Sequence, residues 1–181
     1  MKKTDLENFN EWYVDTLKQM YPRRESGIAV FMLSIPLLER YLRQKNQLSP
    51  SDDLNDAFMK DLCTLFVALA DVKTARQFWS VYRNGFLHQA TLSLRTRKGK
   101  NLPVGVLSHD LADAVAADGK KFLVHPVLFS QCVIREIEQN FSVFSKSIAA
   151  PLPTVSQYKL IQAGVTHPYE GTSAALVPKK P

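Results

Sequence analysis

Arg83 and His88 are the two residues of this chain whose types and spacing best fit a chemical reaction. They lie five positions apart in the segment RNGFLH, inside an otherwise apolar stretch. Arginine is a permanent planar cation that binds phosphate oxygens, and histidine can transfer a proton near neutral pH. The pair therefore indicates an anionic substrate, of which a phosphate ester is the commonest kind.

RNA can be cleaved without a metal ion by these two kinds of group. A base removes the proton of the 2′-hydroxyl, and a cation stabilises the charged phosphorane. We expect His88 to act in proton transfer and Arg83 to stabilise the phosphorane. The alternative without catalysis is that His88 is an ordinary core or surface residue and that Arg83 lies over apolar surface.

The helical geometry of this segment sets the expected roles of its other residues. Residues five apart on an ideal α-helix differ in direction by about 140°, so Arg83 and His88 are not expected to share one face. Asn84 precedes His88 by four residues and should share its face, where it can orient the imidazole. Gly85 weakens a helix by roughly 1 kcal/mol, which hints at close approach by a second element, such as the same segment of a second subunit.

A basic stretch surrounds the pair. No Asp or Glu occurs from position 73 to 109, and the net charge of the whole chain is +6. Positive charge favours a polyanionic partner, although a basic run is more often only a solvated face. The residues expected to hold a nucleic-acid backbone are Lys73, Arg76, Arg95, Arg97, Lys98 and Lys100.

The remaining sequence predicts a mainly α-helical domain over residues 1–149. Periodic apolar residues predict about five long helices in an antiparallel bundle, at about 4–21, 26–45, 54–70, 74–90 and 126–148. Thr4 and Glu7 have the spacing of a capping box, and Pro126 suits the first turn of the last helix. The early part of the helix at 26–45 is apolar on most sides, which predicts a central, buried helix.

Two segments depart from the helical pattern. Residues 91–125 predict a small insert resembling a β-hairpin, with strands at about 91–97 and 104–107, one or two helical turns at 110–117, and a third strand or extended lead-in at 122–124. Residues 150–181 contain five prolines and predict an extended or disordered tail.

Several classes of protein are disfavoured by the sequence. Cys63 and Cys132 belong to no CxxC pair, and no His, Cys, Asp or Glu cluster has metal-ligand spacing. No glycine-rich phosphate-binding motif is present. The longest apolar run, 28–38, is shorter than the roughly 20 residues that span a bilayer, and the N-terminus has no signal-peptide pattern. We therefore expect a cytoplasmic protein with no metal, no cofactor and no membrane segment.

The segment WSVYRNGFLHQ, residues 79–89, resembles the signature of the HEPN superfamily (higher eukaryotes and prokaryotes nucleotide-binding). That signature has an Arg, a polar residue directly after it, and a His a few residues later, which Arg83, Asn84 and His88 match. The resemblance implies an all-α domain and a metal-independent endoribonuclease whose composite site forms in a homodimer. It equally allows a non-catalytic module that binds RNA, a nucleotide or a protein partner such as an antitoxin.

The same resemblance implies an acidic residue on an earlier helix that supports the motif. Glu39 is our candidate, and the alternative for it is a surface ion pair with Arg40 or Arg43. The insert at 91–125 and the proline-rich tail are not part of the family's core pattern, so the subfamily stays open.

Overall fold

Local sequence signals start most of the helices. The computed structural model describes residues 4–93, 99 and 101–145. Thr4 and Glu7 form the expected capping box at the start of α1 (Asp5–Phe9). The helix continues without a break through the π-helix η1 (Asn10–Val14) and α2 (Asp15–Met20). A short 3-10 turn, η2 (Arg24–Ser26), then leads into α3 (Gly27–Lys45), the longest helix in the described part of the chain.

The middle of the chain adds two shorter helices and a second π-helix. Asn55 caps α4 (Asp56–Leu65), and Asp71 caps α5 (Val72–Trp79). The π-helix η3 (Ser80–Leu87) follows α5 directly; it carries Arg83 and Asn84, and His88 caps its C-terminal end. Pro126 opens α6 (Pro126–Gln139) as expected, and α7 (Phe141–Phe144) comes after a break at Asn140.

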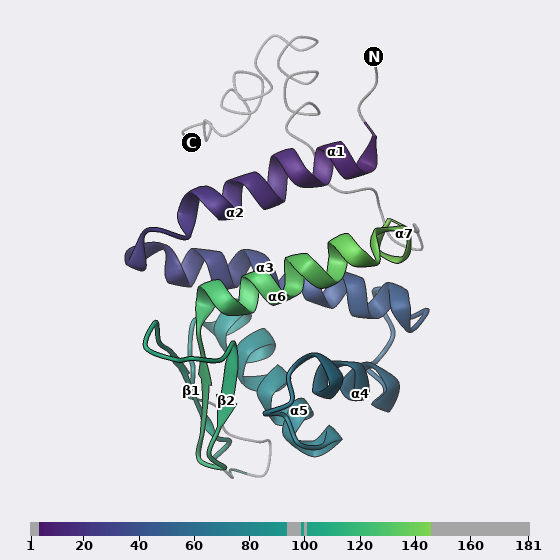
Figure 1. Cartoon of the computed structure of the whole chain (residues 1–181). Coiled ribbons are helices and arrows are strands. Elements are labelled where there is room, and N and C mark those ends of the chain that lie inside the picture. Colours follow the sequence, from purple (N-terminus) through teal and green to yellow (C-terminus); the bar gives the residue numbers. More distant parts are fainter. Residues whose placement is uncertain (1–3, 94–98, 100, 146–181) are drawn as a thin grey trace, which may run out of the picture.

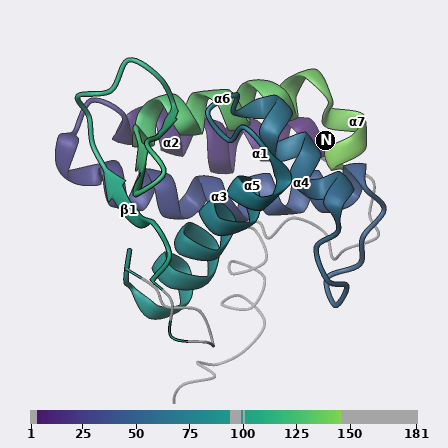
Figure 2. The ribbon, with the colours of Figure 1, turned by 90° about the horizontal axis from the view of Figure 1, so that it is seen from below.

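The helices surround a central pair, α3 and α6, which pack against each other. The run from α1 to α2 crosses one side of this pair, and α4, α5 and the sheet lie on the other side (Figure 1). Figure 2, seen from below, shows α5 crossing beneath α3. The core between these layers is aromatic: the ring of Phe31 contacts the rings of Tyr82 and Phe129, and Phe78 contacts Tyr82. The prediction of a mainly helical protein is therefore confirmed.

The insert folds as a small mixed sheet of three strands. The strands are β1 (Val104–Leu107), β2 (Val115–Ala117) and β3 (Lys121–Val124), in the order β1-β3-β2. β1 pairs with β3 in parallel, whereas β2 and β3 form an antiparallel hairpin. Gly119 takes a φ of +80° in the turn of that hairpin, a conformation that glycine adopts freely.

Three predictions for the insert need correction. Residues 91–93 are not a strand, and residues 94–98 lie outside the described part of the chain. The segment 110–117 ends in β2 instead of helical turns, because Val115 is buried against the other strands and its backbone pairs with Val124. The sheet is also more than a hairpin, since β1 pairs in parallel across an intervening segment.

The finer prediction of about five long helices is not confirmed. α4 has 10 residues, and the last long helix ends at Gln139 instead of near 148. Asn140 leaves the helical conformation there, and its side chain donates a hydrogen bond to the carbonyl of Glu136. The predicted tail, 150–181, lies outside the described residues.

α3 is central, as predicted, but it is not buried on all sides. Ile28 is 56% exposed, and Met32 and Leu33 are each 41% exposed. Among the described helices, none is long and apolar enough to cross a membrane.

Candidate functional site

The π-helix η3 brings Arg83 and His88 into contact. In a π-helix the backbone hydrogen bonds run from residue i to i+5, so one turn takes up more residues than the 3.6 of an α-helix. Residues five apart therefore come to lie near one another on the same face. Nη1 of Arg83 lies 2.6 Å from Nε2 of His88. Our expectation that the two side chains point apart was wrong, because it assumed an α-helix.

The contact defines the tautomer of His88. A guanidinium group carries only donors, so Nε2 of the imidazole must accept the hydrogen bond from Arg83. Nε2 is then unprotonated, and the ring proton of the neutral imidazole is on Nδ1. The side chain of His88 is exposed. The site thus presents a proton acceptor at the surface, held next to a cation.

Contrary to our expectation, Asn84 does not orient His88. Within the described residues, Asn84 makes no hydrogen bond to the imidazole; its Oδ1 instead accepts a long, 3.5 Å hydrogen bond from Nη1 of Arg83. Nε2 of His88 is engaged by Nη1 of Arg83 instead. Gly85 is buried within the chain, and its carbonyl accepts hydrogen bonds from the backbone N–H groups of His88 and Thr91.

Glu39 of α3 binds the other edge of Arg83. Nε of Arg83 donates to Oε2 of Glu39 at 2.9 Å, and Nη2 donates to Oε1 at 3.4 Å. This two-point contact fixes the plane of the guanidinium, because both groups are flat and their forks match. Only 14% of the Glu39 side chain is exposed. Glu39 and Arg83 therefore form a direct, partly buried ion pair.

Arg43 completes the cluster, and from the sequence it was named only in the alternative for Glu39, as a surface partner of that carboxylate. It lies one turn after Glu39 and donates from Nε to Oε1 at 2.9 Å. Glu39 therefore pairs with Arg43 as well as with Arg83, and the side chains of Glu39 and Arg43 are each only 14% exposed. The i,i+4 spacing of Glu39 and Arg43 was the available signal.

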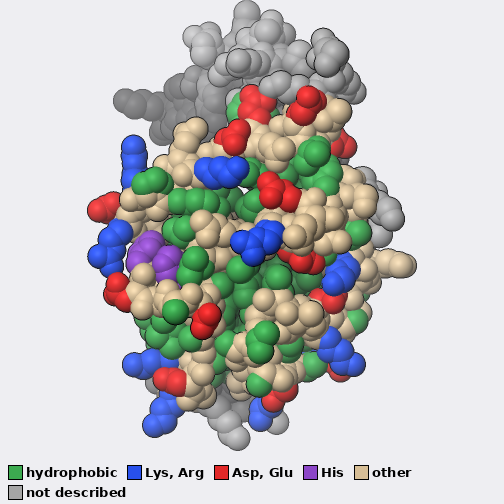
Figure 3. Space-filling model, in the orientation of Figure 1, with side chains coloured by type: hydrophobic (Ala, Val, Ile, Leu, Met, Phe, Trp, Pro, Cys, Tyr) green, Lys and Arg blue, Asp and Glu red, His purple; other side chains and the backbone are tan. Residues whose placement is uncertain are grey.

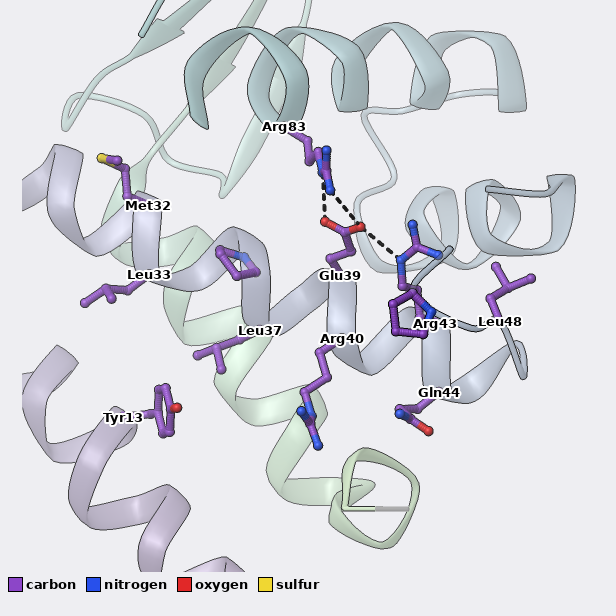
Figure 4. Close-up of a pocket in the computed structure, with 12 residues that line it drawn as sticks. Tyr13, Met32, Leu33, Leu37, Glu39, Arg40, Arg43, Gln44, Leu48 and Arg83 are labelled. Carbon is purple, nitrogen blue, oxygen red and sulfur yellow. Dashed lines mark hydrogen bonds and ion pairs between the residues drawn. The ribbon is translucent and has the colours of Figure 1, made fainter. Parts of the chain in front are cut away.

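Arg43 also fastens the loop after α3 to the site. Its Nη1 donates to the carbonyl oxygens of Ser49 and Asp52, at 2.8 Å and 3.0 Å. A continuous chain of contacts therefore runs from His88 through Arg83, Glu39 and Arg43 to this loop. Figure 4 shows Glu39 between the two arginines, with the dashed contacts joining α3 to the helix that carries Arg83.

Tyr82 anchors the π-helix from behind. It is fully buried, and its hydroxyl donates its one proton to the nearer carbonyl, that of Phe122 at 2.7 Å, while accepting from the N–H of Val106. Burial raises the pKa of Tyr82, so the hydroxyl stays a donor at any physiological pH. Gly105 of β1 allows the sheet to come this close: an added Cβ would lie 2.8 Å from Val81 and 3.2 Å from the ring of Tyr82.

The predicted nucleic-acid contacts are only partly placed by the structure. Lys73 is exposed on α5. Arg76 pairs with Asp56 at 2.6 Å and donates to the carbonyl of Leu54. Four predicted contact residues lie outside the described part of the chain: Arg95, Arg97, Lys98 and Lys100. On the face drawn in Figure 3, blue and red side chains alternate around a largely green centre.

Two further histidines lie together away from this cluster. The rings of His109 and His125 are 5.2 Å apart, edge to face. Nδ1 of His125 caps α6 by accepting the N–H of Leu128, and Nε2 of His109 contacts the carbonyl of Arg24. Within the described residues, no group of three or more His, Cys, Asp or Glu side chains is placed to hold a metal ion.

Comparison of the chain with protein-family models, with curated proteins and with solved structures found no match. What supports a function is therefore the geometry of Arg83, His88, Glu39 and Arg43, together with the short resemblance over residues 79–89.

Proposed function

We propose that this protein is a metal-independent endoribonuclease with an HEPN-like helical domain. The observation that carries the proposal is the contact between Nη1 of Arg83 and Nε2 of His88. It pairs an unprotonated imidazole nitrogen with a cation at an exposed position, which are the two groups that transesterification of RNA requires. A π-helix is rare and is found often at functional sites, which supports the same assignment.

In the proposed reaction, a phosphate of the RNA takes the place of His88 at Nη1 of Arg83. Glu39 keeps hold of Nε and Nη2, so the rigid guanidinium stays in place and the exposed imidazole turns away from it. Nε2 of His88 then removes the proton of the 2′-hydroxyl, whose oxygen attacks the phosphorus. The phosphorane charge is stabilised by Arg83, and the bond to the 5′-oxygen breaks. The products are a 2′,3′-cyclic phosphate and a 5′-hydroxyl, which takes up a proton.

A homodimer is part of this proposal. Departure of the 5′-oxygen is easiest when a second acid donates that proton, and the partner subunit's His88 would supply it. The exposed apolar side chain of Ile28 on α3, outside the wall formed by Met32 and Leu33, offers contact surface for a second copy. The antiparallel bundle of the family and a cytoplasmic location belong to the same proposal.

The test is cleavage of a fluorogenic RNA by the purified full chain in excess EDTA. His88→Ala should lower the rate by about 10²-fold or more, since it removes the base. Arg83→Ala should lower it by about 10²-fold to 10³-fold, since it removes the cation. His109→Ala, a histidine outside the cluster, should leave the rate within a factor of about two. Absence of cleavage by the wild-type chain with varied RNAs, or equal cleavage by the His88 variant, would overturn the proposal.

The second candidate function is a non-catalytic module that binds RNA, a nucleotide or a protein partner such as an antitoxin. The exposed apolar residues of α3 favour it, because a partner protein would bury them. Salt-sensitive RNA binding without cleavage would support this alternative.

A further inference from the structure

A pocket of about 500 Å³ lies directly beside the Arg83–Glu39 pair. It is bounded by η1, by the outer face of α3 and by the loop after α3, and Figure 4 shows its lining. Arg83 and Glu39 belong to both the pocket and the candidate site. Whatever occupies the pocket therefore also touches the proposed phosphate-binding arginine.

One end of this pocket is cationic. Two arginines of its lining, Arg43 and Arg83, share one carboxylate, that of Glu39. Two positive charges against one negative charge leave this pair of arginines with a positive balance, which attracts an anion.

The rest of the lining is apolar. Tyr13 faces the outer side of α3, and most of the wall is aliphatic: Met32, Leu33, Pro36, Leu37, Leu48 and Pro50. Met32 and Leu33 are each 41% exposed, so this wall is open to a ligand. A free inorganic phosphate would leave the wall uncovered, and a purely apolar ligand would leave the arginines unmatched.

A nucleotide has the shape and chemistry that match both ends. Its base is flat and largely apolar, and its phosphate is anionic; the volume is within the usual range of 300–1,000 Å³ for ligand pockets. Gln44, which is 7% exposed, also lines the pocket, and its Oε1 has no hydrogen-bond partner among the described residues. The amino group of a base is a donor of the kind that this acceptor lacks.

We propose that this pocket is a base subsite of the ribonuclease, in which a nucleotide next to the scissile phosphate lies against Met32 and Leu33 with its phosphate on Arg83. The role of this pocket in RNA cleavage rests on the proposed function, whereas the binding of a nucleotide in it does not. The site is separate from the His88 side of Arg83, so a bound strand would pass over the arginine from the pocket to the imidazole.

The experiment measures binding of a 2′-O-methylated ApA dinucleotide to the full chain by titration calorimetry. The methyl group blocks the attacking oxygen, so the probe reports binding whether or not the chain cleaves RNA. The variant is Met32→Gln with Leu33→Gln, which keeps the size and charge of both side chains. The matched control is Leu6→Gln with Val67→Gln, because these apolar residues are 41% and 86% exposed and neither lines the pocket.

We expect the pocket variant to raise the Kd of the dinucleotide at least tenfold, and the control to change it less than twofold. An unchanged Kd in the pocket variant would overturn the subsite. Sedimentation of the same samples measures the oligomeric state. If the pocket variant dissociates from dimer to monomer and its affinity for the dinucleotide is unchanged, a second copy of the chain covers this wall instead of a nucleotide. Cleavage of RNA by the wild type with no effect of the pocket variant on KM would reject the subsite and leave the proposed function standing.

Discussion

Nη1 of Arg83 lies 2.6 Å from Nε2 of His88, although five residues separate the two along the chain. The contact depends on the π-helical hydrogen bonding of η3, and it requires the imidazole to accept. We expect nitrogen-detected NMR of the neutral side chain to show the proton of His88 on Nδ1. Arg83→Ala should change the tautomer balance toward the Nε2–H form, with His109 of the same sample as an internal reference. A mainly Nε2–H form of His88 in the wild type would contradict the assignment.

Replacement of Arg83 by lysine should abolish most of its function while keeping its charge. A lysine has no planar fork, so it cannot hold both oxygens of Glu39 and also reach His88. We expect Arg83→Lys to lower RNA cleavage by about 10²-fold. Arg24→Lys is the matched control, because Arg24 is paired with the exposed carboxylate of Asp110 outside the cluster, and it should stay within about threefold. Equal losses in both variants would mean that the fork of Arg83 has no special role.

Glu39→Gln should destabilise the fold more than an ordinary surface change does. It leaves Arg83 and Arg43 without their shared anion in a largely shielded place, which should lower the free energy of unfolding by roughly 1–3 kcal/mol. Asp56→Asn removes the exposed partner of Arg76 and should cost at most about 1 kcal/mol. Urea denaturation followed by circular dichroism measures both. A smaller loss of unfolding free energy in Glu39→Gln than in Asp56→Asn would contradict the central position of the Glu39 carboxylate in the cluster.

The sequence predicted the start of α1, the bounds of α3 and the start of α6, because capping residues and proline act within one helical turn. It also named Arg83, His88 and Glu39 as candidates for one site, but it placed Arg83 and His88 on different faces of their helix. It could not predict how they meet: Phe78, Tyr82 and Phe86 keep an i+4 spacing that is typical of an α-helix, while the backbone there is π-helical. Nor could it predict the β1–β3 pairing, since parallel strands are joined by contacts distant in sequence.

Gly105→Ala should disturb the site from the far side of Tyr82. The added methyl group would lie 2.8 Å from Val81 and 2.9 Å from Leu92, closer than side chains tolerate. Overpacking of this kind costs roughly 1–3 kcal/mol, measured by thermal or urea unfolding. Val104→Ala, at a 41% exposed position in the same strand, should cost less than about 1 kcal/mol. Stability of the Gly105 variant equal to that of the wild type would mean that β1 can move away without loss.

Lowering the pH should destabilise the fold, because it protonates His125. Burial and the neighbouring His109 lower the pKa of His125 below its ordinary value of 6.5, and its Nδ1 caps α6 only when unprotonated. The unfolded chain binds this proton more readily than the folded chain does. The stabilising contribution of His125 is therefore present above about pH 6.5, and it is lost as the pH falls through the lower pKa that His125 has in the folded chain. His125→Asn supplies a cap that does not titrate, so unfolding free energies measured from pH 7.5 to 5 should fall less steeply in that variant. Parallel pH profiles would exclude His125 as the cause.

The hydrogen-bond pattern of η3 has a consequence for chain length. A turn closed from i to i+5 holds one residue more than the same turn closed from i to i+4. A chain with one residue fewer between Arg83 and His88 could regain ordinary α-helical bonding there and keep Tyr82 in the core. Its histidine would then lie four residues after Arg83, a spacing that keeps two side chains of an α-helix on one face. A one-residue deletion in this segment should therefore keep the Arg–His contact while it changes the helix from π to α.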